Sequence, residues 1–152
     1  MSGVTVRAAG EADLAALLAL RHEVFVLEQG VPAELESDDY DVTAAHVVAV
    51  DAGGHVVGTG RVYREAGQAY GDLPVPVGHI GRLAVARTAR GKGIGAALVR
   101  ALEDRARTLG LGAVVLGAQL HAVEFYRGLG YQPYGEVFDD AGIGHRWMRR
   151  RL

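Results

Sequence analysis

The segment that most constrains the fold is RTARGKGIGAALVRALEDRA, residues 87–106. Between Arg87 and Gly95 it combines three glycines with three basic residues, and it continues directly into an amphipathic helical pattern. Residues 79–85 (HIGRLAV) have the pattern of a strand, so the segment predicts a strand, a glycine loop and a helix that begins near Ile94. Such a loop presents free backbone N–H groups at the positive end of a helix dipole, which is a geometry that binds phosphate.

The spacing of the glycine loop excludes two nucleotide-binding motifs. A Walker loop needs Ser or Thr after Gly-Lys, but Gly93 follows Lys92. A Rossmann fingerprint needs G-x-G-x-x-G, whereas the glycines here follow G-x-G-x-G. Two interpretations remain. The loop binds phosphate or pyrophosphate, with Arg87, Arg90 and Lys92 adding positive charge at its rim, or it is a tight connection with solvated basic side chains.

The composition sets broad limits on the class of protein. With 152 residues, 49% of them hydrophobic and 22% charged, the chain is expected to form one domain over residues 1–152. The absence of cysteine excludes disulfides, thiolate metal ligands and a cysteine nucleophile. A net charge of −2 and the lack of any apolar run near ~18 residues give no reason to expect nucleic acid or membrane as a partner. We therefore expect a cytoplasmic protein in a reducing compartment.

Hydrophobic periodicity predicts strands that alternate with helices. In the helix after the glycine loop, Glu103 and Arg107 are expected to pair on the solvent side, and Gly110 is expected to end the helix. The order predicts an α/β fold with a mixed sheet and flanking helices. The first half of the chain is expected to hold a strand at 4–8, a helix from 11, an acidic irregular segment at 28–41 with room for a short helix, and a hairpin at 44–64 with its turn at 51–54. The second half is expected to hold a strand at 79–85, helix 94–109, strand 113–119, a short helix at 122–129 and a closing hairpin of strands 131–138 and 143–150.

Two motifs at a fixed separation resemble those of the GNAT superfamily of N-acetyltransferases. RGKGIG, Arg90–Gly95, resembles the [Q/R]-x-x-G-x-[G/A] loop that binds the pyrophosphate of acyl-CoA, and AVEFYRGLGY, 122–131, resembles the second signature, A-x-x-F-Y-x-x-x-G-[FY]. Three further segments resemble the ElaA-type branch of this superfamily, namely RHEVFVLEQGVP, GRLAV and FDDAGIGHRWM. The resemblance covers essentially the whole chain. It implies a mixed, mostly antiparallel central sheet flanked by helices, with a splayed strand pair for acyl-CoA.

The resemblance implies an enzyme that uses acetyl-CoA as co-substrate. Backbone N–H groups of the glycine loop would bind the pyrophosphate, and the backbone of the LAV strand would bond the pantetheine and polarise the thioester carbonyl. Gln119 stands where many members carry Asn and is a further candidate contact. The expected acyl-CoA residues are Leu83, Ala84, Val85, Arg90, Gly91, Lys92, Gly93, Ile94, Gly95, Ala96 and Gln119.

Tyr126 matches the family tyrosine that donates a proton to the departing CoA thiolate. A phenol is a suitable donor because a thiol with a pKa near ~8.5 leaves more easily when it is protonated. From the residues alone, Tyr126 also shares an apolar stripe with Phe125 and Leu129, which is typical of a core position. Both interpretations remain open, and the resemblance favours the catalytic one.

His79, four residues before Leu83, matches the position where some members hold a general-base carboxylate. Its ordinary pKa near ~6.5 suits proton acceptance, although a lone histidine at a strand edge is commonly structural or solvated. Glu28 and His145 are rivals, because the resemblance places their motifs on the acceptor side. The histidines show no close pair with a third ligand, so no metal site is expected. With no cysteine and no G-x-S-x-G, we expect direct transfer in a ternary complex.

The acceptor is expected to be a small-molecule or peptide amine, and the sequence does not separate these. Within residues 34–41 an acidic segment would attract a cationic amine. Such a segment is also typical of a solvated loop, and its carboxylates could equally well pair with Arg21 and Arg82. A non-catalytic acyl-CoA-binding module and a nucleotide-binding loop are the competing functions. An exposed edge strand at the C-terminal end would allow a homodimer.

Overall fold

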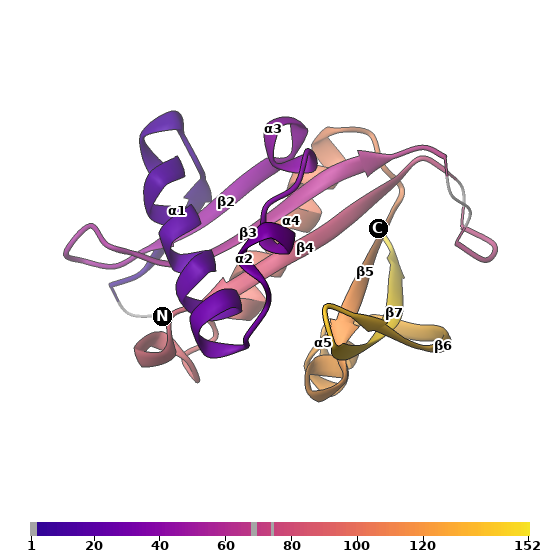
Figure 1. Cartoon of the computed structure of the whole chain (residues 1–152). Coiled ribbons are helices and arrows are strands. Elements are labelled where there is room, and N and C mark those ends of the chain that lie inside the picture. The colour runs from indigo at the N-terminus through magenta and orange to yellow at the C-terminus, as the bar shows by residue number, and fades with distance from the viewer. Residues whose placement is uncertain (1–2, 68–69, 74) are drawn as a thin grey trace.

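The computed structural model describes residues 3–67, 70–73 and 75–152. One seven-stranded sheet, in the order β1-β2-β3-β4-β5-β7-β6, runs through the molecule (Figure 1). Every neighbouring pair is antiparallel except β4 and β5, which are parallel. The strands are β1 (Thr5–Ala8), β2 (Ala45–Val50), β3 (Val56–Glu65), β4 (Val77–Val85), β5 (Ala113–Gln119), β6 (Gln132–Asp140) and β7 (Ile143–Arg151).

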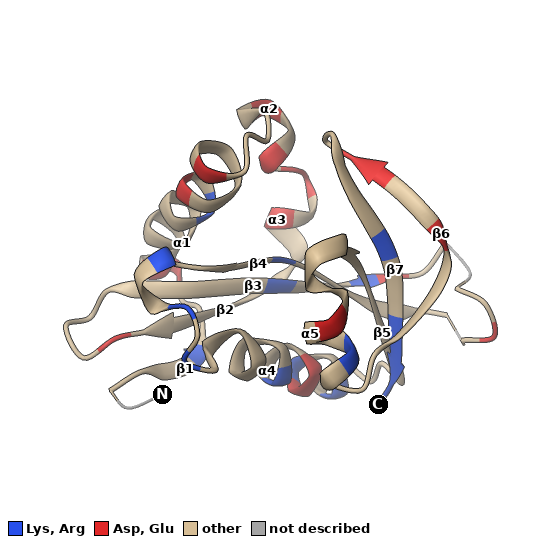
Figure 2. Ribbon diagram, turned by 90° about the horizontal axis from the view of Figure 1, so that it is seen from below, with Lys and Arg blue, Asp and Glu red and all other residues tan. Residues whose placement is uncertain are grey.

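Helices cover both faces of this sheet. Figure 2 shows α1, α2 and α3 on one face of β2–β4 and α4 on the opposite face. The acidic segment, expected to be irregular with room for a short helix, contains α2 and the start of α3. A 3₁₀ turn at Glu11–Asp13 precedes α1, and a π-helical stretch at His22–Glu28 follows it. The helices are α1 (Leu14–Arg21), α2 (Ala33–Glu36), α3 (Tyr40–Thr43), α4 (Ile94–Thr108) and α5 (Val123–Gly128), and none of them is long and apolar enough to cross a membrane.

Helix α4 packs closely against β3 because two glycines face it. A Cβ atom at Gly58 would lie 2.9 Å from Leu98 Cδ1, and one at Gly60 would lie 2.8 Å from Leu102 Cδ1. Both leucines are fully buried in the main core. Larger side chains at the glycines would push α4 away from the sheet, so this close packing fixes where α4 and the glycine loop before it lie.

Strands β4 and β5 pair over only two residues and then separate. Gly78 and His79 are the last residues of β4 to pair with β5, and beyond them β5 is held by β7 on its other side. A bulge marks the divergence, because Arg82 and Leu83 together face the single residue Gly60, and Arg82 has a φ of 51°. Figure 1 shows β5, β7 and β6 turned away from β2–β4. The expected splayed strand pair is thus confirmed.

The structure corrects the prediction for the solvent side of α4. Glu103 is buried, and its carboxylate accepts a hydrogen bond from the Tyr131 hydroxyl at 2.7 Å and forms an ion pair with Arg150. Arg107 instead pairs with Asp104 at 2.8 Å. The helical pattern could not indicate that Tyr131 and Arg150, which come from later in the chain, cover this part of α4. At the C-terminal end of the chain, β6 of the closing hairpin forms one edge of the sheet.

Candidate acyl-CoA and acceptor site

The glycine loop ends in an uncapped helix start. Gly93 is the N-cap residue of α4, with a φ of 79°, and no side chain caps the helix. Gly91 has a φ of 76°, and residues with a Cβ adopt these left-handed conformations only at a cost. Ala97 donates to the Gly93 carbonyl at 3.2 Å, so the amides before Ala97 have no acceptor within the helix. These N–H groups are available to a phosphate oxygen.

The side chain of Arg90 is held by the protein itself. Its guanidinium donates to both carboxylate oxygens of Glu28, at 2.7 and 2.8 Å, and its Nε donates to the Val85 carbonyl at 3.0 Å. The hydrogen bonds from Arg90 lower the pKa of Glu28. Glu28, expected on the acceptor side, therefore lies beside the glycine loop and does not line the pocket described below.

A pocket of about 530 Å³ lies where β4 and β5 diverge. Its wall includes residues of β3, β4, β5, α5 and β7 together with the α2–α3 segment. Five of the residues predicted from the sequence meet here, whereas Ala84, Val85 and the loop 90–96 lie outside its lining. The five are His79, Leu83, Gln119, Tyr126 and His145.

Tyr126 lies on α5 with 8% of its surface exposed. The rings of Phe125 and Tyr131 surround it at centroid distances of 4.9 and 5.8 Å. Burial raises the pKa of Tyr126 to about 12, so its phenol keeps its proton at neutral pH. Phe125 also lies against the glycine loop, because a Cβ atom at Gly95 would be 3.3 Å from the Phe125 ring. Helix α5 thus connects the pocket to the start of α4.

His79 lies at the last paired position of β4 and β5, opposite Val115. Its Nδ1 is 2.9 Å from Oε2 of Glu65, and its ring stacks on Tyr63 and meets Trp147 edge-on. Burial lowers the pKa of His79, and the hydrogen bond to Glu65 acts in the opposite direction without reversing the shift. His79 is therefore neutral near pH 7.

Two other predicted pocket residues are hydrogen-bonded to neighbours. Nδ1 of His145 is 2.7 Å from the Ile143 carbonyl, and because a carbonyl only accepts, this nitrogen carries the proton. Gln119 donates through Nε2 to Oε1 of Gln29 at 2.8 Å, and its own Oε1 is 2.7 Å from His121 Nε2. Both polar groups of the Gln119 amide are thus engaged by protein side chains.

One wall of the pocket is held by an ion-pair cluster of three arginines and three carboxylates. The clearest pairs are Arg21 with Glu36 at 2.6 Å and Arg61 with Asp38 at 2.6 Å. Arg21 and Arg61 are buried. The cluster joins the α2–α3 segment to α1, β3 and β4, and it carries no net charge when every member is ionised. Its members are Arg21, Arg61, Arg82, Glu36, Asp38 and Asp41.

Asp41 is the carboxylate that links two of these arginines. Its oxygen Oδ1 is 2.7 Å from both Arg21 and Arg61. Burial alone would raise the pKa of Asp41, but hydrogen bonds from Arg21, the Asp38 amide and Arg61 outweigh it and hold this pKa well below its usual range. Of the uses considered for the acidic segment, pairing with arginine is the one that the structure shows for these carboxylates.

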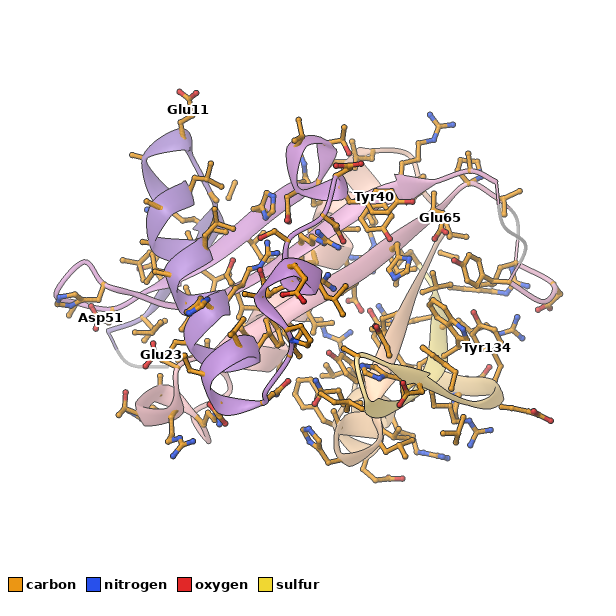
Figure 3. All side chains as sticks on the ribbon, viewed as in Figure 1. Glu11, Glu23, Tyr40, Asp51, Glu65 and Tyr134 are labelled. Carbon is orange, nitrogen blue, oxygen red and sulfur yellow. The ribbon has the colours of Figure 1, made fainter. Side chains whose placement is uncertain are left out.

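Several residues in or beside the pocket were missed by the sequence analysis. Glu65, Tyr63 and Arg61 alternate along β3 and therefore share one face of the sheet with His79. Tyr40 of α3 stacks on Tyr63 with ring centroids 3.9 Å apart, and Figure 3 shows Tyr40 and Glu65 near this end of β3. The sequence did contain one signal for these contacts. Arg61 is a charged residue within the apolar run of β3, and a buried charge needs a partner.

Similarity to known proteins places the chain among the acyltransferases. A model of the acetyltransferase (GNAT) domain matches residues 8–152, and the chain belongs to this family. It is 38% identical to the uncharacterized N-acetyltransferase YjcF of Bacillus subtilis, over 95% of this chain and 97% of that protein. It is 33% identical to Protein ElaA of Escherichia coli, over 92% and 88% respectively, which supports the ElaA-like branch.

Solved structures agree with this assignment. The crystal structure of Escherichia coli ElaA superposes with a TM-score of 0.79 and 30% identity, covering 97% of this chain and 99% of that one. An acyl-CoA N-acyltransferase from Pseudomonas aeruginosa superposes with a TM-score of 0.78 and 31% identity, covering 97% of each chain. The chain is therefore an acyltransferase of a family that generally uses acetyl-CoA.

Proposed function

We propose that this protein transfers an acetyl group from acetyl-CoA directly to a primary amine while both substrates are bound, without an acyl-enzyme. The observation that carries this proposal is the position of one pocket at the divergence of β4 and β5, with a protonated phenol and a neutral imidazole both in its wall. The pocket provides a place where an amine and a thioester would meet.

The residues present fit acetyl-CoA as a co-substrate. The free amides at the start of α4 would hold the pyrophosphate, and the edge of β4 beyond His79 has no strand partner on the β5 side. This edge, at Leu83–Val85, offers backbone groups to the pantetheine arm and to the thioester carbonyl. Acetyl-CoA supplies the activated acetyl group, and the protein supplies position and proton transfer.

Two side chains account for the protons. An amine that arrives as an ammonium ion loses two protons when it becomes an amide. His79, neutral near pH 7, accepts one of them and passes it to solvent. Tyr126 gives its proton to the sulfur as the C–S bond breaks, and it is restored by the second proton from nitrogen. The carbon–nitrogen bond forms as the carbon–sulfur bond is lost.

A panel of amines tests this function. Purified protein is incubated with acetyl-CoA and each amine, and thiol release is followed together with the mass of the acetylated product. We expect release with at least one primary amine and none with its N-acetyl form. A companion thermal-shift measurement should show stabilisation by acetyl-CoA but not by ATP. Binding of acetyl-CoA without transfer to any amine would favour a non-catalytic acyl-CoA module, and equal stabilisation by ATP would favour a nucleotide site.

A further inference from the structure

We propose that Glu65 is a positioning residue for the reaction: its carboxylate fixes the tautomer of His79 so that Nε2 is the atom that accepts the proton of the acceptor amine. This inference rests on the proposed function. Within the described part of the chain, Nδ1 of His79 meets Glu65 at 2.9 Å and Nε2 has no hydrogen-bond partner. Because an ionised carboxylate only accepts, Nδ1 carries the proton and the lone pair lies on Nε2.

Strand register explains why these two side chains meet. Tyr63 of β3 lies directly opposite His79 of β4, and Glu65 lies directly opposite Val77. Glu65 is therefore the diagonal neighbour of His79 on the same face of the sheet, within reach of a long side chain. Both side chains are 18% exposed, so their contact is largely shielded from water.

A second donor holds the carboxylate itself. The Tyr70 hydroxyl donates to the same Oε2 atom of Glu65, at 2.6 Å. Tyr70 is 2% exposed and packs in a small core with Leu73, Val77 and Val115. Buried Tyr70 thus holds in place the Glu65 oxygen that faces His79. This arrangement resembles the way a carboxylate orients a catalytic histidine in other enzymes.

Aromatic rings fix the plane of the imidazole. Tyr63 covers one face of His79, with centroids 4.9 Å apart and planes at 21°. Trp147 meets the ring edge-on at 5.5 Å. Rotation of the ring would break both contacts. The aromatic neighbours therefore set the orientation of His79, while Glu65 selects the nitrogen that holds the proton.

Charges around His79 set the direction expected for its titration. Burial lowers the pKa of His79, Glu65 raises it, and the positive charges of Arg61 on β3 and Arg82 on β4 lower it. Tyr63 and Tyr70 face the pair as neutral phenols, since burial raises the pKa of each well above neutrality. Removing the negative charge at Glu65 is therefore expected to lower the pKa of His79 further.

The test compares Glu65→Gln with the wild type. The amide keeps the size of the side chain but lacks the negative charge, and it can donate to Nδ1 and so favour the wrong tautomer. We expect kcat/KM to fall at least about tenfold, since a positioned general base contributes about 10²–10⁴. The acid limb of the pH profile should move to lower pH. The Kd of acetyl-CoA should stay within about twofold, because the cofactor loop is not involved.

Two controls separate positioning from general loss of structure. Glu136→Gln makes the same chemical change at an exposed position of β6 and should leave the rate and the pH profile unaltered. Tyr70→Phe keeps the ring but removes the hydroxyl bond to Glu65, and it should lower kcat/KM by less than about fivefold. ¹⁵N NMR of the His79 ring gives a readout that needs no turnover, with Nδ1–H expected in the wild type.

An unchanged acid limb and rate in Glu65→Gln would overturn the positioning role while leaving acetyl transfer intact. An Nε2–H tautomer in the wild type would overturn it even if Glu65→Gln did not fold. Absence of thiol release by the wild type with every amine would instead contradict the proposed function. In that case the NMR comparison alone decides whether Glu65 controls His79: loss of Nδ1–H in Glu65→Gln supports the inference, and its retention overturns it.

Discussion

The glycine loop and the pocket between β4 and β5 are built on opposite principles. The loop is a continuous stretch, residues 90–96, and the groups proposed to bind acetyl-CoA are backbone amides whose positions follow from two left-handed glycines and the start of α4. The pocket is made of side chains from at least four strands and three helices, joined by contacts between residues far apart in the chain. The motif of the loop, Arg90–Gly95, can be recognised in the sequence, whereas the pocket forms only when the chain has folded.

The same contrast applies to charge. At the loop, Lys92 is exposed, and Arg90 is already bound to Glu28. In the pocket wall, arginines and carboxylates are buried or partly buried, and they pair across 15 to 44 positions of sequence. Charge at the loop should therefore contribute modestly to affinity, because water and salt screen it. Charge in the pocket wall should contribute to folding, because an unpaired buried ion is costly.

The largest effect is expected from Tyr126→Phe, which removes the proposed proton donor from the pocket without touching the loop. We expect kcat at saturating acetyl-CoA to fall about 100-fold, in the range of general acid catalysis, with the Kd of acetyl-CoA unchanged. Because burial raises the pKa of Tyr126 to about 12, deprotonation of this residue should add no basic limb below pH 10.

The matched control for Tyr126→Phe is Tyr134→Phe. The Tyr134 hydroxyl lies on β6, is buried and has no hydrogen-bond partner within the described structure. Its removal should leave kcat within about twofold. A value of kcat for Tyr126→Phe within threefold of the wild type would remove Tyr126 from the mechanism and return it to the core.

An effect of similar size, on stability rather than on rate, is expected from Arg21→Met, which breaks the pocket wall. Glu36 would lose its buried partner and Asp41 would lose one of its two, and we expect the free energy of unfolding at pH 7 to fall by about 3 kcal/mol. The exposed Arg64→Met should change it by less than about 0.5 kcal/mol. Urea unfolding of both variants measures this difference.

The pH dependence of that loss has a definite sign. The folded-state pKa of Asp41 is depressed, so its stabilisation is present above the unfolded value near ~3.9 and is lost as pH falls through the folded value. The deficit of Arg21→Met relative to the wild type should therefore shrink below about pH 4. A deficit that is constant from pH 7 to pH 3 would show that packing, not charge, is what Arg21 contributes.

The fold was predictable to the extent that it depends on local pattern. Periodicity located the helix that begins at Ile94, and the uncharged run 113–119 is a buried strand as expected. Glu103 was misplaced because a period of 3.6 assigns it to the polar side, whereas Tyr131 and Arg150 provide partners only in the folded chain. Tertiary contacts outweighed the helical pattern at this residue.

The site was predictable in the same unequal way. Motif spacing predicted roles for Tyr126 and the glycine loop, and the structure places Tyr126 in the pocket. Glu65 and Arg61 were missed because their partners are 14 to 23 residues away. The register of β3 against β4 decides the contact of Glu65 with His79, and no motif specifies register. The contact of Arg61 with Asp38 depends on how the α2–α3 segment packs on β3. Glu28 illustrates the same point, since its partner Arg90 is 62 residues away.

A moderate effect on affinity is expected from Gly93→Ala, which strains the loop backbone without adding or removing charge. Gly93 has a φ of 79°, and an alanine there costs about 1 kcal/mol or turns the amides away from the ligand. We expect the Kd of acetyl-CoA to rise about fivefold to tenfold by calorimetry. Gly112→Ala, where φ is ordinary and space is open, should leave the Kd unchanged.

The smallest effect is expected from Lys92→Ala, which removes a charge from the loop and leaves its backbone intact. Lys92 is exposed, and at 0.15 M salt a charge is screened over about 8 Å, so the Kd of acetyl-CoA should rise by less than about threefold. The difference from the wild type should widen at low salt. Suppose instead that Lys92→Ala weakened binding more than Gly93→Ala at physiological salt. Side-chain charge, and not the backbone amides, would then be the main contribution to pyrophosphate binding. The contrast between the loop and the pocket would disappear.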